Sequence, residues 1–212
     1  MKAIIAKKLF TGREVINNGV VLFKGGKITA IGPRDKVALP AECVVLDHSD
    51  EVVMPGMIDC HTHLTLCAQA SNYAQAMKDQ DFVLLLRGAN NMRQDLLAGI
   101  TTARIMGDKN FVDVAFKDAA EKGIVPSPRL LISGKGIRSS YGHGIMATAF
   151  DGVEEVRKAA RINIHDAGAD QLKLFVSGSK GEFKNFAFGT EKAVSLSPSG
   201  SKMRSRMKSP RR

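Results

Sequence analysis

The stretch MPGMIDCHTHL, residues Met54–Leu64, marks the point at which short strands give way to an alternation of strands and helices. Within it, GMIDCHTHL is a candidate buried strand of mixed apolar and polar character. On a strand, His61 and His63 point to the same face, whereas Thr62 points to the other. Two imidazoles at the end of a strand can ligate one cation. The same spacing is also found in hydrogen-bonded polar residues that bind nothing.

Upstream of this stretch, the first 55 residues consist of short β-rich runs. GVVLFKGGKITAIG holds two such runs joined by Gly25 and Gly26, which is a two-residue hairpin signal. Two further apolar runs follow, Val44–Leu46 and Val52–Met54. We therefore predict a small antiparallel β unit over residues 1–55.

Downstream, three segments with helical spacing of apolar residues each end at a glycine and lead into a strand. The helices are expected over Asp79–Ala98, Val112–Lys122 and Val153–Ala167, followed by Gly99, Gly123 and Gly168. The strands that follow them are ITTARIM, PRLLISG and QLKLFVSG. Such an alternation is typical of an α/β domain with parallel strands.

The predicted α/β region is about half the size of a closed barrel. It offers four strands over residues 56–178, and a closed eight-stranded barrel takes roughly 250 residues. From residue 179 the alternation stops. Residues 179–212 are rich in Ser, Lys and Arg and contribute +7 of the net charge of +10, so we predict a basic, disordered tail.

Composition narrows the class of protein. With most of its charge in the tail, the body is close to neutral and does not indicate a nucleic-acid partner. The three cysteines show no C-x-x-C spacing, which favours free thiols in a reducing cytoplasm. No apolar run of about 18 residues is present, so no membrane span is expected. Lys7 and Lys8 interrupt the first apolar run too early for a secretory signal.

Several ordered motifs together resemble the amidohydrolase superfamily over residues 2–178. PGMIDCHTH is similar to the signature of its first barrel strand, and LAGITTARIMGD to its second-strand segment. LFTGREVINNGVVLFKGGKITAIG resembles the N-terminal part of its composite β-sandwich. PSPRLLISGKGIRSSYGHG and GADQLKLFVSG resemble the imidazolonepropionase-like and Xaa-Pro dipeptidase-like branch. The resemblance implies a small β-sandwich portion followed by the first half, about four βα units, of a (β/α)8 TIM barrel.

The resemblance also implies roles for four residues. His61 and His63 would ligate a divalent metal, and Lys173 would be carbamylated and bridge two metals, because a carbamate is an anionic oxygen donor whereas an ammonium is not. His143 would contact the substrate or the developing oxyanion. Lys173 as a solvated strand-end lysine and His143 as an ordinary loop histidine remain open alternatives. One departure concerns Ile105, where this branch often has an aspartate after the arginine.

The family's remaining donors are not found in this sequence. The resemblance implies histidines from the fifth and sixth strands and an aspartate from the eighth. The other histidines, His48 and His165, are not positioned to replace them. Zinc in proteins takes three or four ligands, so weak metal binding and no hydrolysis are expected from this chain alone. A truncation or frameshift after about residue 178 would explain the change of composition there.

The expected function is therefore that of a metal-dependent hydrolase, of which this chain is an inactive fragment. The metal would activate water for attack on the C–N bond of a small amide, a cyclic amide or a dipeptide. Zinc is the default metal, one or two ions, with manganese and iron left open. The alternative is a non-catalytic half-barrel that binds anionic partners through its basic tail. A second copy of the chain could cover the open barrel edges.

Overall fold

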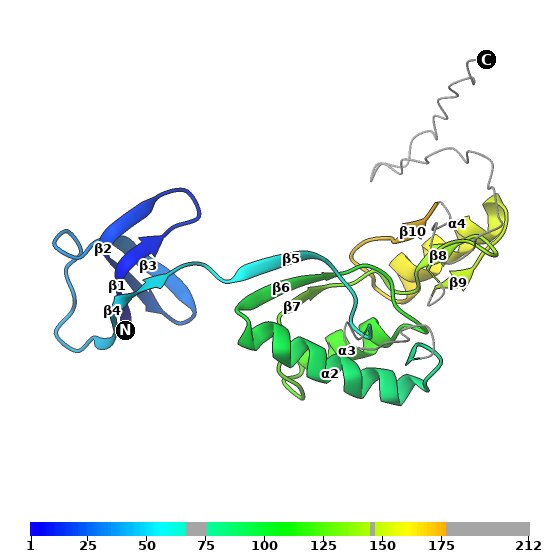
Figure 1. Cartoon of the computed structure of the whole chain (residues 1–212), viewed down its shortest axis with the longest axis horizontal. Helices are drawn as coiled ribbons and strands as arrows, with labels where there is room; N and C mark the ends of the chain where they lie inside the picture. The colour runs from blue at the N-terminus through cyan, green and yellow to red at the C-terminus, as the bar shows by residue number, and fades with distance from the viewer. Residues whose placement is uncertain (67–75, 145–146, 177–212) are drawn as a thin grey trace, which may run out of the picture. The chain divides into compact units, whose positions relative to one another are not determined.

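The computed structural model describes residues 1–66, 76–144 and 147–176. The chain divides into two compact units, Met1–Met57 and Ile58–Arg212 (Figure 1). None of the helices in the described part of the chain is long and apolar enough to span a membrane. The predicted tail over residues 179–212 lies outside the described residues, and the three predicted domain assignments stay predictions.

The first unit is a four-stranded sheet in the order β3-β2-β1-β4. Its strands are β1 (Lys2–Phe10), β2 (Val15–Lys24), β3 (Lys27–Pro33) and β4 (Val44–Val53). Strand β2 pairs antiparallel with both β1 and β3. The hairpin predicted between β2 and β3 is confirmed, because Gly25 and Gly26 adopt φ of 58° and 74°. Positive φ at both central positions is what a type I′ turn requires.

The prediction of a wholly antiparallel unit is wrong at β4. This strand pairs parallel with β1, on the edge opposite β2, with a register shift between Ala6 and Lys8. Residues 34–43 carry the chain across the sheet, so β4 starts at the same end as β1 (Figure 1). The two predicted apolar runs also belong to one continuous strand. Their polar connection, Asp47–Glu51, is tolerated because β4 is an edge strand that is exposed along most of its length.

The second unit begins with a three-stranded sheet in the order β5-β6-β7, accompanied by two helices (Figure 1). The strands are β5 (Met57–Thr62), β6 (Ile100–Ile105) and β7 (Arg129–Leu131), and the helices are α2 (Asp81–Leu97) and α3 (Val112–Glu121). Both helices match their predicted ranges. Gly99 and Gly123 follow them with φ of 88° and 71°, which confirms the predicted helix ends. Leu84 and Met92 of α2 pack against Ala103 and Ile105 of β6 in the main buried cluster.

The second half of this unit contains shorter elements. They are β8 (Ile137–Arg138), β9 (Thr148–Ala149), α4 (Val153–Arg161), the π-helical turn η1 (Ile162–Asp166) and β10 (Leu174–Phe175). The third predicted helix is therefore α4 continued by η1, and Gly168 follows with φ of 68°. Strand β8 pairs parallel with β10, as β6 pairs parallel with β7.

The fold class is mixed α/β, as predicted. In the described ranges the strands of this unit form two sheets, β5-β6-β7 and β10-β8-β9, and not one continuous sheet. Residues 129–138 connect them, because β7 pairs with β6 and β8 pairs with β10. An isolated parallel bridge joins Asp108, which follows β6, to Lys135, which lies between β7 and β8. A specific barrel of four βα units stays a prediction.

Candidate metal centre

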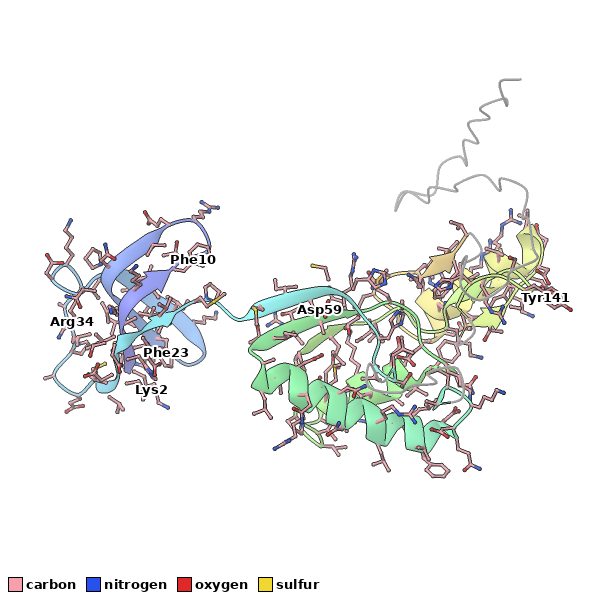
Figure 2. All side chains as sticks on the ribbon, viewed as in Figure 1. Lys2, Phe10, Phe23, Arg34, Asp59 and Tyr141 are labelled. Carbon is pink, nitrogen blue, oxygen red and sulfur yellow. The ribbon has the colours of Figure 1, made fainter. Side chains whose placement is uncertain are left out.

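His61 and His63 lie at the end of β5. His61 occupies the penultimate position of the strand and is exposed, whereas His63 directly follows the strand and is half-buried. Their ring centroids are 5.8 Å apart, with the ring planes inclined at 60°. The backbone N–H of His61 donates a hydrogen bond of 2.9 Å to Oδ1 of Asp59, which is also on β5 (Figure 2). The two imidazoles are therefore neighbours, as the strand spacing predicts.

His63 is oriented by a backbone carbonyl. Its Nδ1 donates a hydrogen bond to the carbonyl oxygen of Gly107 at 3.0 Å, since a carbonyl can only accept. The proton is thus on Nδ1, and Nε2 keeps the lone pair that a metal needs. Gly107 has φ of +88°, and a Cβ there would meet Cγ of Lys173 at 3.0 Å and Cα of Gly136 at 3.2 Å. Only glycine fits between these groups without displacing them.

Lys173 directly precedes β10, where its carbonyl oxygen accepts a hydrogen bond from the N–H of Ile137 at 2.9 Å. Its Nζ lies 4.7 Å from the centroid of the Phe175 ring, within the range of a cation–π contact. Partial burial lowers the pKa of the Lys173 ammonium, and the positive charge of Arg104 lowers it further. Arg104 is itself fixed on β6 by a hydrogen bond from Nε to the carbonyl oxygen of Cys60 at 2.6 Å.

His143 lies on the loop that follows β8, two residues after Tyr141, which Figure 2 labels. Its ring centroid is 5.5 Å from that of Phe175, in an edge-to-face arrangement. Phe175 therefore contacts both Lys173 and His143, although these residues come from segments 30 positions apart.

The electrostatics of His63 link the four predicted residues. Burial is the main cause that lowers the pKa of the His63 imidazolium, and the Gly107 hydrogen bond opposes this. The positive charges of Lys173, His61 and His143 lower it further. The contacts agree: His61 neighbours His63, and Gly107 lies between His63 and Lys173. Phe175 joins Lys173 to His143, so the structure brings the four predicted residues to one region.

Asp108 is a residue that the sequence reasoning missed. Its side chain is 1% exposed and accepts hydrogen bonds from the Thr65 hydroxyl and from the backbone N–H of Leu64 at 3.1 Å. Burial raises the pKa of Asp108 to about 7, and the nearby Asp113 carboxylate adds to this, whereas the hydrogen bonds oppose it. The signal that could have identified it is its position as an acidic residue soon after the predicted strand ITTARIM. Asp108 fixes the segment that follows the two histidines.

Three of the four residues, His61, His63 and Lys173, could contribute donors to a metal ion as part of a larger set of ligands. His63 offers Nε2, and the neighbouring His61 ring can supply a second nitrogen. Lys173 donates to a metal only after its charge is removed. Across the described ranges, no group of three or more His, Cys, Asp and Glu side chains comes together in a way that could hold a metal ion. A tetrahedral zinc site needs more donors than this pair.

A model of the amidohydrolase family matches residues 52–200, which runs past residue 178, where the resemblance was expected to end. Two curated relatives illustrate the range of similar enzymes. An imidazolonepropionase from Brucella anthropi is 40% identical over 81 residues, which are 37% of this chain and 18% of that protein. A 5'-deoxyadenosine deaminase from Methanosarcina mazei is 29% identical over 140 residues, which are 62% of this chain and 29% of that protein.

Solved structures with a similar fold include two prolidases. A prolidase in complex with N-methylphosphonate-L-proline has a TM-score of 0.70 and 27% identity, covering 82% of this chain and 46% of that chain. A putative prolidase from Bifidobacterium longum has a TM-score of 0.66 and 28% identity, covering 81% of this chain and 40% of that chain. The chain thus corresponds to less than half the length of these relatives.

Proposed function

Because this chain belongs to the amidohydrolase family, we propose that it forms part of the catalytic centre of a metal-dependent hydrolase that breaks carbon–nitrogen bonds. The observation that carries the proposal is the hydrogen bond from His63 to Gly107, next to His61 and within electrostatic range of Lys173 and His143. It prepares one imidazole nitrogen for a cation at the end of a strand, with a lysine and a third histidine nearby.

Each of the four residues has a role in this proposal. His61 and His63 are ligands through their imidazole nitrogens. Lys173, as its neutral amine, reacts with carbon dioxide, forms an N–C bond and releases a proton. The resulting carbamate is an anionic oxygen donor. His143 donates a hydrogen bond to the substrate carbonyl oxygen as negative charge develops on it.

A bound divalent metal would lower the pKa of water and polarise the carbonyl of the scissile bond. This chain's residues hold and orient the reacting groups. Two imidazoles and one lysine are fewer donors than zinc takes in a catalytic site, so the chain by itself binds metal weakly and does not hydrolyse its substrate.

The substrate class follows from the relatives. They include an imidazolonepropionase and prolidases, which supports a small amide, a cyclic amide or a dipeptide as substrate. Four parallel βα units over residues 56–178 would make the first half of a barrel, preceded by a portion of a β-sandwich. The alternative of a binding protein with a basic tail depends on residues 179–212, outside the described part of the chain, and no observation favours it.

Calorimetric titration of the chain with Zn²⁺ tests the proposed ligands. We expect weak binding that is lost in His61→Asn and in His63→Asn. The matched control is His48→Asn, because His48 lies in the first unit and contacts Glu51 at 2.9 Å. Binding by His48→Asn should equal that of the wild type. Zn²⁺ binding that survives both ligand substitutions, or that falls equally in the control, would overturn the proposal.

A further inference from the structure

Phe175 contacts both Lys173 and His143. Its ring centroid is 4.7 Å from Nζ of Lys173 and 5.5 Å from the His143 ring. Lys173 and Phe175 are two positions apart at β10, so a strand conformation directs both side chains to the same face. The contact to His143 instead joins β10 to the loop after β8.

Two glycines enclose the Phe175 ring. A Cβ on Gly136 would lie 2.8 Å from Cε2 of Phe175, and a Cβ on Gly144 would lie 2.8 Å from three atoms of the same ring. Both distances are too short for real contacts, so neither position accepts a side chain unless the ring moves. The ring therefore fills a space between the start of β8 and the loop that carries His143.

The loop has a second attachment that does not involve Phe175. Arg138 donates from Nε to the carbonyl oxygen of Ala147 at 3.0 Å and from Nη1 to that of Gly142 at 3.2 Å. Arg138 is also the residue that pairs with Phe175 in the parallel ladder. The guanidinium holds the backbone of the loop, whereas the aromatic ring contacts the side chain of His143.

We infer that Phe175 is a positioning residue, which holds the side chains of Lys173 and His143 in fixed places relative to each other. The catalytic importance of this role rests on the proposed function, whereas the contacts of Phe175 with Lys173 and His143 do not depend on it. In the metal-free chain a phenyl ring suits both contacts, because its face attracts the Lys173 ammonium and its edge-to-face contact with imidazole is favourable. Once Lys173 is carbamylated, the ring limits the positions of the lysine side chain by packing alone. An aliphatic side chain of similar size fills the space but provides neither interaction.

Nuclear magnetic resonance on the full chain with ¹³C-labelled lysine and histidine tests this placement. The ring current of Phe175 should displace the side-chain resonances of Lys173 and His143, which Lys173→Arg and His143→Gln assign. Phe175→Leu should remove both displacements, and Phe175→Tyr should keep them. The matched control is Phe82→Leu, because Phe82 is 61% exposed on α2. It should change neither resonance.

Gly136→Ala provides a test that keeps the ring. Its added methyl group pushes against Phe175, so both resonances should move while the backbone amide spectrum of the remaining chain is retained. If Phe175→Leu leaves either resonance in place, or Phe82→Leu has the same effect, Phe175 does not position the two residues and the inference is wrong.

Titration with Co²⁺ separates the inference from the proposed function. Loss of a positioning contact is expected to weaken metal binding by about 10-fold to 100-fold in Phe175→Leu, with recovery in Phe175→Tyr. Unchanged affinity in a Phe175→Leu protein whose resonances have moved would overturn the positioning role at the metal. If the wild type binds no Co²⁺, the proposed function fails, and the resonance displacements alone then decide the inference.

Discussion

The carbonyl oxygen of Gly107 lies 3.0 Å from Nδ1 of His63 and accepts its hydrogen bond. A backbone group is a rigid acceptor, so this bond fixes both the tautomer and the rotation of the imidazole. Gly107 has φ of +88° and is packed against Lys173, which connects the end of β6 with two of the proposed ligands. We therefore expect a substitution at Gly107 to affect the proposed metal binding through the shape of the backbone.

Replacing Gly107 by alanine should weaken Zn²⁺ binding as well as stability. A non-glycine residue at this φ costs roughly 1–2 kcal/mol, and the new Cβ would also meet Cγ of Lys173 at 3.0 Å. Urea unfolding measures the first effect and calorimetric titration the second. The matched control is Gly123→Ala, where φ is +71° and no atom lies within 4 Å of the added Cβ. Equal loss of Zn²⁺ binding in both variants would contradict this prediction.

Asp108 should make the stability of the chain fall as the pH rises from about 4 to about 7. Its pKa is raised from 3.8 to about 7, chiefly by burial, so the folded state holds a proton that the unfolded state has lost in this range. Such a group lowers the free energy of unfolding by up to about 1.4 kcal/mol per pH unit. Asp108→Asn should therefore reduce the slope of the urea midpoint between pH 5 and pH 7. Part of the slope should remain, because burial also raises the pKa of Asp113.

Asp151→Asn is the control for this profile. Hydrogen bonds from the Ser140 hydroxyl and backbone N–H lower the pKa of Asp151 below its usual value. Its contribution to stability is present above that value and is lost only at lower pH, so it does not alter the profile between pH 5 and pH 7. A slope that is unchanged in Asp108→Asn would show that Asp108 is not responsible for it.

The parts of the fold that were predicted correctly depend on local chemistry. Gly99, Gly123 and Gly168 each adopt the positive φ that ends a helix, and Gly25 with Gly26 forms the turn between β2 and β3. Glycine adopts these conformations without strain because it has no side chain, and a glycine is visible in the sequence. The helices α2 and α3 were predicted from the helical spacing of their apolar residues, which is also a local property of the sequence.

The parts that were not predicted depend on contacts between distant residues. The parallel direction of β4 is determined by the path of residues 34–43, which composition does not reveal. The burial of Asp108 depends on Thr65 and Leu64, 43 and 44 positions away. Motif resemblance identified Lys173 and His143 as candidates, but their shared contact with Phe175 follows only from the pairing of β10 with β8. Their catalytic roles stay predictions.

The segment that follows His63 should lose stability in Asn91→Ala. From α2, Nδ2 of Asn91 donates to the carbonyl oxygens of Leu64 at 2.9 Å and Leu66 at 2.8 Å. Loss of these bonds leaves two acceptors near a fully buried Leu64 side chain, which should cost about 1–3 kcal/mol in urea unfolding. Asn90→Ala is the control, because it is the same substitution at an exposed position of the same helix, and its gain in helix propensity is the same. The His63 resonances should move only in Asn91→Ala. Equal unfolding midpoints for the two variants would mean that the amide of Asn91 does not hold this segment.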